Sequence, residues 1–361
     1  MRLASRARHL EVQLLADEFG NAVALAGRDC SVQRRHQKIT EEGPVVAAPP
    51  HVWSKMEKAA VALAETVGYS NAGTVEYLYA GDDGEDGGGT FAFLELNPRL
   101  QVEHPVTEMI TGVNLPAAQL QVAMGMTLDR IPDIRRLYAR EPYGVDRIDF
   151  RSEKQRAPMG HVIACRITAE NPEQGFQPTS GAVTELNFRS TPDVWGYFSV
   201  DSSGRVHEFA DSQIGHLFSW GTNREAARRS MVVALKELSI RGDIRTTVEY
   251  LVHMLESRAF ADNRITTEWL DDRISSRIPL RKPDALLVAV AGAIAQAYQA
   301  MEHRVRDFSR AMEAGQTPPA DLLAVEQQAE LIYDGTKYRL HTALSGPNTL
   351  SVSGNGGTVQ A

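Results

Sequence analysis

Phe93-Leu-Glu-Leu-Asn-Pro-Arg-Leu-Gln-Val-Glu-His-Pro105 sets acids, an amide and an arginine among apolar residues in a strand-like alternation. Glu95 and Asn97 are two residues apart, so on a strand their side chains point to one face. Hard oxygen ligands on one face suit a Mg²⁺ ion that is bound together with nucleotide phosphates. The alternation continues through Arg99, Gln101 and Glu103. The stretch therefore predicts a wall of oxygen ligands, a cation, an amide and a candidate base, with a solvated polar strand face as the alternative interpretation.

A hairpin would add a third carboxylate to this wall. Two further segments alternate like strands, on either side of a glycine-rich loop at 81–89: Thr74–Tyr79 and Thr90–Glu95. We expect a hairpin with Leu78 opposite Phe93, which places Glu76 opposite Glu95. Opposed carboxylates repel each other in an ordinary sheet, whereas a shared divalent cation would hold them together. The spacing therefore predicts a metal site formed by Glu76, Glu95 and Asn97.

Other motifs accompany this stretch in a fixed order along the chain: RHLEVQ at Arg8–Gln13, QRRHQK at Gln33–Lys38, GTVE at Gly73–Glu76, and ACRITAE at Ala164–Glu170. Together they resemble the biotin carboxylase component of biotin-dependent carboxylases, which are ATP-grasp enzymes. Two later motifs are similar to the multidomain acetyl-CoA carboxylases of eukaryotes: FADSQIGHLFSWG at Phe209–Gly221 and TEWLD at Thr267–Asp271. The resemblance covers nearly the whole chain to about Arg273 and continues more weakly beyond it. Several motifs in order are far more specific than one glycine loop.

The resemblance implies how metal and nucleotide are bound. Glu76, Glu95 and Asn97 would hold Mg²⁺ or Mn²⁺ that bridges the phosphates of ATP. His9 and His36 would contact the nucleotide. Taken alone, each histidine favours a simpler interpretation: His9 a solvated strand edge that it shares with Glu11 and Gln13, and His36 a solvated basic turn. The order of the motifs together favours the functional interpretation.

The resemblance also implies how bicarbonate and biotin are handled. Bicarbonate contacts would come from Lys38, Gln101, the backbone of Val102, and Arg166. Glu103 would deprotonate bicarbonate, which ATP activates as carboxyphosphate, and Arg99 would stabilise the biotin enolate. Arg166 would also hold phosphate and the ureido group, although an arginine in an apolar strand is usually a buried ion-pair partner. Fixed cations suit this chemistry because negative charge develops in the transition state, and the planar fork of arginine fits carboxylate-like ligands.

Composition limits the class of protein. The 361 residues are 43% hydrophobic and 23% charged, as in an ordinary globular protein with room for two or three domains. The formal net charge of −8 argues against general nucleic-acid binding. The basic turn also lacks the interleaved aromatic residues of a single-strand binder. We therefore expect no nucleic-acid partner.

Cysteine usage and the apolar runs predict a cytoplasmic protein. Cys30 and Cys165 are too few for a disulfide framework, so a reducing compartment is expected. The start Met1–Arg8 lacks the apolar core of a secretory signal. It weakly resembles a transit peptide, but the strand that carries His9 begins at once. The longest apolar run, Ala285–Ala295, is too short for a transmembrane segment.

Periodicity and turn residues predict individual elements. We expect a strand at His9–Ala16 that pairs back through Ala22–Ala26, a helix at Pro50–Val67 that stops at Gly68, and a helix capped by Asn114. Thr222 and Glu225 predict a capping box before a helix at 226–238. A long helix is expected at 283–314, and a hairpin around Asp334-Gly335.

The expected fold is α+β, and the resemblance divides it into successive parts: the C-terminal half of an ATP-grasp domain at 1–126, a connecting or surface segment at 127–157, the biotin carboxylase C-terminal domain at 158–275, a helical linker at 276–328, and the start of a β-barrel at 329–361. The upstream Rossmann-like domain, its glycine-rich phosphate loop and the biotin-carrying motif are not found in the sequence. The expected protein is therefore a fragment of acetyl-CoA carboxylase that is inactive alone, because the upstream ATP-binding part is missing. Its expected partners are bicarbonate, a biotinylated carrier domain and, in the full enzyme, a second copy.

Two alternatives stay open. The chain could be a non-catalytic association module that retains the fold. It could also be the biotin carboxylase part of a pyruvate or propionyl-CoA carboxylase, against which the motif after Phe209 argues.

Overall fold

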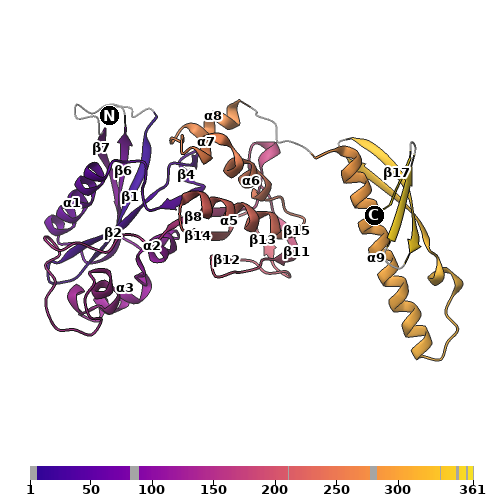
Figure 1. Cartoon of the computed structure of the whole chain (residues 1–361), viewed down its shortest axis with the longest axis horizontal. Helices are drawn as coiled ribbons and strands as arrows, with labels where there is room; N and C mark the ends of the chain where they lie inside the picture. The colour runs from indigo at the N-terminus through magenta and orange to yellow at the C-terminus, as the bar shows by residue number, and fades with distance from the viewer. Residues whose placement is uncertain are drawn as a thin grey trace. The chain divides into compact units, whose positions relative to one another are not determined.

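The computed structural model describes residues 6–81, 89–209, 211–276, 283–333, 335–346, 349–354 and 357–360. The chain divides into two compact units, Met1–Ile278 and Pro279–Ala361. Helices and antiparallel sheets are mixed in both units (Figure 1). The expected α+β class is therefore confirmed.

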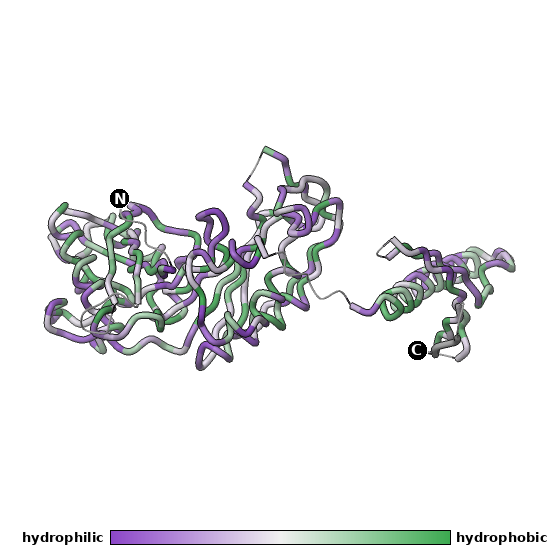
Figure 2. Tube along the Cα trace, turned by 90° about the horizontal axis from the view of Figure 1, so that it is seen from above, coloured by the Kyte–Doolittle hydropathy of each residue, from purple (hydrophilic) through white to green (hydrophobic). Residues whose placement is uncertain are grey.

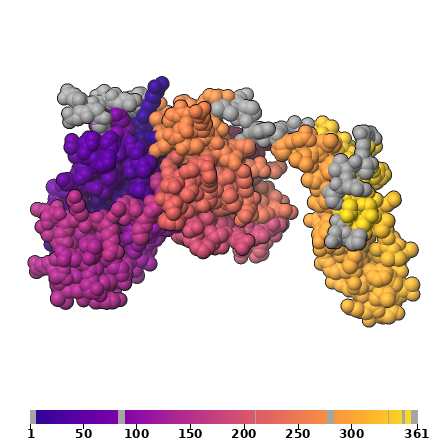
Figure 3. Space-filling view, viewed as in Figure 1, coloured from indigo at the N-terminus to yellow at the C-terminus, as the bar shows by residue number. Residues whose placement is uncertain are grey.

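The first unit is built on an eight-stranded sheet in which all neighbouring strands run antiparallel. Its order in space is β12 (Val194–Phe198), β14 (Gln213–Gly221), β8 (His161–Thr168), β5 (Thr40–Gly43), β2 (Ala22–Asp29), β1 (Arg8–Ala16), β6 (Asn71–Ala80) and β7 (Thr90–Asn97). The pairing of β5 with β8 joins strands about 125 residues apart, Thr40 lying opposite Cys165. In the space-filling view the indigo-to-magenta and orange parts of this unit accordingly abut over a broad front (Figure 3).

Smaller sheets and helices surround the large sheet. The small sheets comprise β3 (Gln33–Arg34) with β4 (Gln37–Lys38), β9 (Glu170–Asn171) with β10 (Gln177–Pro178), and β13 (Arg205–Val206) with β11 (Gly181–Asn187) and β15 (Ser239–Gly242). The helices are α1 (Pro50–Val67), α2 (His104–Thr111), α3 (Leu115–Ala123), η1 (Leu128–Arg130), α4 (Pro132–Leu137), η2 (Pro172–Gln174), α5 (Arg224–Glu237), α6 (Val248–Glu256), α7 (Arg258–Ala261) and α8 (Trp269–Ser275).

Helix α1 decides which face of the sheet is free for polar chemistry. It begins at Pro50, a residue tolerated in the first turn, and ends before Gly68, whose φ of 64° is the left-handed conformation of a helix C-cap. Helix α1 lies beside the strands β1, β6 and β7 (Figure 1). Its apolar face packs with the alternate β1 residues Leu10, Val12 and Leu14. The residues between them therefore point to the opposite face of the sheet.

The register of β6 and β7 confirms one expected pair and corrects another. Glu76 lies opposite Glu95, but Phe93 lies opposite Tyr77 instead of Leu78. The register shifts after Glu76 because β7 holds one extra residue, Leu94, in a β-bulge, a feature that alternation does not reveal. Of the expected loop at 81–89, residues 82–88 lie outside the described residues.

Two local expectations need correction. Helix α5 begins at Arg224, and Asn223 caps it by accepting a hydrogen bond from the Ala226 amide at 2.9 Å, so Thr222 is not the cap. The segment expected to be superficial also contributes to the core: its buried apolar residues are Leu128, Ile131, Ile134 and Leu137. Asn114, by contrast, caps α3 as expected, accepting from the Ala117 amide.

The second unit pairs one long helix with a four-stranded antiparallel sheet. Its elements are α9 (Ala285–Glu313), η3 (Ala320–Leu323), β16 (Glu326–Tyr333), β17 (Thr336–Gly346), β18 (Thr349–Gly354) and β19 (Gly357–Gln360). Tyr333 pairs with Thr336, which confirms the expected hairpin, although Asp334 itself lies outside the described residues. On α9, Ala289 and Ala293 are buried together with Leu340 of the sheet.

Helix α9 confirms the long helix that was expected at 283–314. Its first half is predominantly hydrophobic (Figure 2), and by length and composition alone the helix could cross a membrane. A single helix of this kind is weak evidence, because core helices of soluble proteins pass the same test.

Candidate functional site

Lys38 lies at the centre of a buried cluster of carboxylates on the face of the sheet opposite α1. Its Nζ donates to Glu11 Oε2 at 2.6 Å, Glu103 Oε1 at 2.8 Å and Glu76 Oε1 at 3.0 Å. These three acids come from β1, β6 and the residue that precedes α2. One ammonium therefore ties together strands and a helix start that are far apart in the sequence.

The predicted metal ligands lie side by side next to this ammonium. Asn97 Nδ2 donates to Glu76 Oε1 and to Glu95 Oε1, at 3.0 Å each. Gln101 Nε2 also donates to Glu76 Oε1, at 3.1 Å. Glu95 is exposed, whereas Glu76 is buried. The side chains of Glu76, Glu95 and Asn97 thus share one face, as the hairpin predicted.

His9 flanks the same carboxylate from the other side. Its Nε2 lies 2.7 Å from Glu76 Oε2, and its Nδ1 lies 2.6 Å from Gln33 Nε2. Gln33 Nε2 also donates to the Cys30 carbonyl at 2.9 Å. His9 is therefore buried in a defined position and is not a solvated strand edge.

Burial and ion pairing compete for the charges of the cluster. Burial raises the pKa of Glu76, but hydrogen bonding by His9 and the charge of Lys38 hold that pKa well below its ordinary range. Burial likewise opposes ionisation of Glu11, yet Arg28 and Lys38 lower its pKa. Burial and the charge of Glu11 raise the pKa of Glu103, and Lys38 with Arg28 bring it below its usual value. The pKa of Lys38 is raised, because Glu11 and its neighbours outweigh desolvation. These directions favour the ionised forms of Glu11, Glu76, Glu103 and Lys38 at neutral pH.

A second basic group reaches the cluster from β8. Arg166 Nη2 lies 3.5 Å from Glu41 Oε1 and 3.9 Å from Glu103 Oε2. Glu41 in turn contacts His216 through its other oxygen, at 2.9 Å. Arg166 is half-buried, so it both pairs with acids and keeps access to the site.

The remaining predicted residues lie outside this hydrogen-bonded cluster. Arg99 is exposed and donates to the Leu100 carbonyl at 3.3 Å. Val102 is 40% exposed, just before α2. His36 is exposed in the turn between β3 and β4. The solvated interpretation of the basic turn is nevertheless wrong for Arg34, which is buried and pairs with Glu170 at 2.8 Å.

Sequence reasoning did not assign roles to two buried residues of the cluster, Glu11 and Arg28. Glu11 shares the alternation of β1 with His9, which was the available signal. Arg28 is fully buried and lies opposite Glu11 in the β1–β2 register. It donates to Glu11, Gln13, Thr107 and Gln101.

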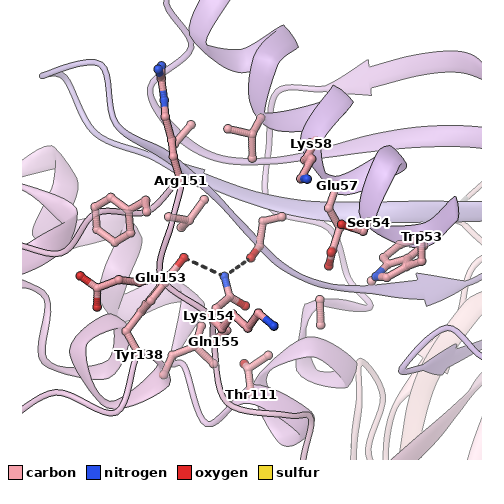
Figure 4. Close-up of a pocket in the computed structure, with 18 of the residues that line it drawn as sticks. Trp53, Ser54, Glu57, Lys58, Thr111, Tyr138, Arg151, Glu153, Lys154 and Gln155 are labelled. Carbon is pink, nitrogen blue, oxygen red and sulfur yellow. Dashed lines mark hydrogen bonds between the residues drawn. The ribbon is translucent and has the colours of Figure 1, made fainter. Parts of the chain in front are cut away.

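A separate hollow lies beside α1. This cavity of about 1120 Å³ is lined by α1, by β2 and by the segment 148–158. Trp53 and Glu57 face Tyr138 and Glu153 across it (Figure 4). Among the described residues that line it, none belongs to the cluster around Lys38. We therefore assign the candidate site to the polar cluster and not to this cavity.

Three family models match successive parts of the chain. They are described as "Carbamoyl-phosphate synthase L chain, ATP binding domain" at residues 2–131, "Biotin carboxylase C-terminal domain" at 164–272 and "Acetyl-CoA carboxylase, BT domain" at 284–361. Their order agrees with the order of the motifs in the sequence.

Curated relatives match nearly the whole chain. The acetyl-CoA carboxylase of Dictyostelium discoideum is 55% identical over 98% of this chain and 15% of the relative. Those of Schizosaccharomyces pombe and Saccharomyces cerevisiae are each 54% identical over 99% of this chain and 16% of the relative. The chain therefore spans about a sixth of the length of these relatives.

Solved structures agree on the fold. The biotin carboxylase domain of a thermophilic 2-oxoglutarate carboxylase, bound to bicarbonate, matches with a TM-score of 0.64 and 30% identity over 75% of this chain and 55% of that chain. A biotin carboxylase complex from Campylobacter jejuni matches with a TM-score of 0.63 and 33% identity over 75% of this chain and 54% of that chain. These matches confirm the expected ATP-grasp biotin carboxylase fold. Together with the curated relatives and the family models, they show that the chain belongs to the acetyl-CoA carboxylase family.

Proposed function

We propose that this chain carries the metal and bicarbonate side of a biotin carboxylase site. In the proposed reaction, ATP and bicarbonate carboxylate biotin, the first half-reaction of malonyl-CoA formation for fatty acid synthesis. The observation that carries the proposal is the Lys38 ammonium, which joins three carboxylates beside Gln101 and Asn97. A related carboxylase domain is described as a complex with MgADP and bicarbonate, which supports the same ligands here.

The residues present fit a divalent cation. Glu76, Glu95 and Asn97 converge on one face and offer the hard oxygen donors that Mg²⁺ or Mn²⁺ prefers. Asn97 directs Nδ2 at both carboxylates, so it would present its carbonyl oxygen after a rotation of the side-chain amide. When bound, the ion would neutralise charge on the phosphoryl group in transfer.

The chain's other residues would bind and activate bicarbonate. Lys38, Gln101, the Val102 backbone and Arg166 would hold the anion, and Glu103 would accept its proton. Glu103 suits that role because Lys38 and Arg28 keep it ionised despite burial. Its lowered pKa makes it a weak base, so we expect an anion that shares Lys38 with it to strengthen its basicity.

The exposed residues would meet the larger substrates. Arg99 is free to stabilise a developing enolate on biotin, in the manner of an oxyanion hole. His36, exposed in its turn, and His9 would contact the nucleotide.

The proposed partners are a biotinylated carrier domain and a second copy of the chain. The dimer is supported by a related structure described as a biotin carboxylase domain dimer. We propose a cytoplasmic location, supported by Cys30 and Cys165, which are free and buried. One relative is named a mitochondrial acetyl-CoA carboxylase, so mitochondria are the alternative location. A fluorescent fusion of this protein that is found in mitochondria would contradict the cytoplasmic proposal.

A chimera tests the function. This chain would replace the matching region of Saccharomyces cerevisiae acetyl-CoA carboxylase, to which it is 54% identical. We expect the chimera to release ADP in a bicarbonate- and biotin-dependent manner, and the isolated chain to release little or none. A folded chimera without turnover would instead favour a non-catalytic association module.

Two single substitutions in the chimera separate the proposed roles. Glu103→Gln keeps the shape and removes the base, so it should abolish turnover and leave ATP binding nearly intact. Glu95→Gln removes a metal ligand and should weaken ATP binding as well. If both substitutions weakened ATP binding equally, Glu103 would belong with the metal ligands.

A further inference from the structure

We propose that Arg28 is a positioning residue that sets the orientation of both Gln101 and Glu11 for bicarbonate. The inference rests on the proposed function, because it concerns groups that would act on that anion. Arg28 itself is fully buried and would touch no substrate.

The guanidinium of Arg28 has four acceptors. Its Nε donates to Glu11 Oε1, its Nη1 to Gln13 Oε1 at 2.9 Å and to Thr107 Oγ1 at 2.8 Å, and its Nη2 to Gln101 Oε1 at 2.9 Å. The acceptors belong to β1, to α2 and to the segment that joins β7 to α2. One planar group therefore relates three parts of the chain to one another.

The hydrogen bonds of Arg28 determine which side-chain atoms of Gln101 and Glu11 face the cluster around Lys38. Gln101 Oε1 is held by Arg28, so its Nε2 must face Glu76, to which it donates at 3.1 Å. A flipped amide would direct NH₂ at the guanidinium, where donor would meet donor. Glu11 Oε1 is likewise held by Arg28, which leaves Oε2 for Lys38 at 2.6 Å. The amide and the ammonium that would bind bicarbonate thus both take their positions from Arg28.

Arg135 provides a matched control. It is also fully buried, and it donates to the carbonyls of Glu141 and Asp129 and to Asp146. Its partners lie in the segment after α3 and include none of the cluster residues. Loss of Arg135 should therefore reproduce the structural effect of losing a buried arginine without disturbing Gln101.

The first experiment follows the side-chain amide of Gln101 in this chain by ¹⁵N NMR, assigned from its loss in Gln101→Glu. In the unsubstituted chain we expect slow hydrogen exchange at Nε2. Arg28→Lys keeps the charge but loses the fork of donors, so exchange should accelerate by about tenfold or more, as expected for loss of roughly 1.4 kcal/mol of hydrogen bonding. Arg135→Lys should leave this signal unchanged.

The second experiment measures kinetics in the chimera. Arg28→Met should lower kcat/KM for bicarbonate on the order of 100-fold, as a misplacement of about 1 Å does, with little change in KM for ATP. Arg28→Lys should recover part of this loss. If Arg28→Met fails to fold, Thr107→Val removes one acceptor and should lower the same constant about tenfold or more, the effect of losing one hydrogen bond to a charged group.

The outcomes distinguish this inference from the proposed function. Unchanged Gln101 exchange in Arg28→Lys, or an Arg28→Lys chimera as active towards bicarbonate as Arg135→Lys, would reduce Arg28 to a structural role and overturn the proposal. A chimera that lacks turnover even with Arg28 would overturn the proposed function, whereas the amide measurement would still decide whether Arg28 positions Gln101.

Discussion

The cluster around Lys38 and the ion pairs around Glu42 are both buried in the first unit, yet they balance charge differently. Glu42 accepts from Arg224 Nε at 2.6 Å and Nη2 at 3.0 Å, and His161 Nε2 lies 3.1 Å away. Although burial raises it, the pKa of Glu42 is lowered to about 2, chiefly by hydrogen bonding to His161 and by Arg224. Arg224 also donates to the Phe260 carbonyl and lies over its ring.

The Lys38 cluster has the opposite balance. One ammonium contacts three carboxylates, and Glu95 stands a short distance beyond Asn97. Burial alone does not separate the two sites, because Glu42 and Glu76 are both buried. The comparison teaches that a buried carboxylate whose charge is matched by its partners, such as Glu42, holds strands and helices together. A surplus of carboxylates on one face of a sheet instead indicates room for a cationic ligand.

Removing the cation from the Lys38 cluster should have the largest effect on stability. Lys38→Met removes the one cation that contacts three buried carboxylates at once and should destabilise the first unit by about 3–5 kcal/mol at pH 7, although Glu11 keeps Arg28 and Glu76 keeps His9. In the fold the pKa values of Glu11, Glu76 and Glu103 are lowered from 4.5, so their ionisation stabilises the protein above that pH and ceases to do so as pH falls. Without Lys38 these carboxylates should take up protons more readily, so the deficit of the variant should shrink at pH 4. Urea unfolding at both pH values measures this.

Arg224→Met is the matched control at the ion pairs around Glu42. Arg224 pairs with one carboxylate, Glu42, which keeps His161 as a partner, whereas Lys38 contacts three, so the loss of stability at pH 7 should be smaller than for Lys38→Met. An equal loss in the two variants, or a Lys38→Met deficit that grows in acid, would remove the distinction between the sites.

Arg99 should show the reverse behaviour, with a large effect on rate and little on stability. It is exposed and makes one hydrogen bond, so Arg99→Ala should change the free energy of unfolding by less than about 0.5 kcal/mol. In the chimera the same change should slow biotin carboxylation roughly 100- to 1000-fold. Arg99→Lys should rescue turnover only in part. Turnover that stays within a few-fold of the unsubstituted chimera would show that Arg99 does not act on biotin.

A divalent cation should distinguish the cluster around Lys38 from the ion pairs around Glu42, because we expect it to bind only at the first. Mn²⁺ at ten times its dissociation constant should stabilise the chain by about 1.4 kcal/mol, because it binds the folded state. Glu95→Gln should abolish this increase in thermal stability, and Glu42→Gln should preserve it. Equal responses of the two variants would place the ion elsewhere.

The part of the site that alternation alone could predict is the part that lies on one local hairpin. The pairing of Glu76 with Glu95 followed from period-two spacing. The bulge at Leu94 lies between that pair and the hairpin loop, so it leaves the pair in the expected register. Arg28 was missed because β2 carries a register shift beside Ala26, whose φ is 56°. Without that shift Arg28 would lie opposite Leu10, on the face that α1 covers.

Long-range pairing explains what else the sequence could not provide. Helix α1 was predictable because proline and glycine mark its ends locally. Arg166, Glu41 and His216 meet only because β5 pairs with β8 and β8 with β14. No periodicity within one segment fixes partners separated by 125 or 175 residues.

The smallest expected effect concerns the helix that delivers Arg224 to Glu42. Asn223→Ala removes the side-chain acceptor of the Ala226 amide at the start of α5 and should destabilise the first unit by about 1 kcal/mol. Thr222→Ala should change stability by less than about 0.5 kcal/mol, because Thr222 is exposed and precedes the cap. Glu225, the other member of the expected capping box, instead accepts from Arg228 and Arg229. Urea unfolding of the two variants compares the caps, and a larger loss in Thr222→Ala would restore the box. The cap supports the helix that carries Arg224, and not the cluster around Lys38. Asn223→Ala should therefore leave the increase in thermal stability with Mn²⁺ unchanged. Loss of that increase would mean that the ion pairs around Glu42 and the cluster around Lys38 are coupled through the sheet.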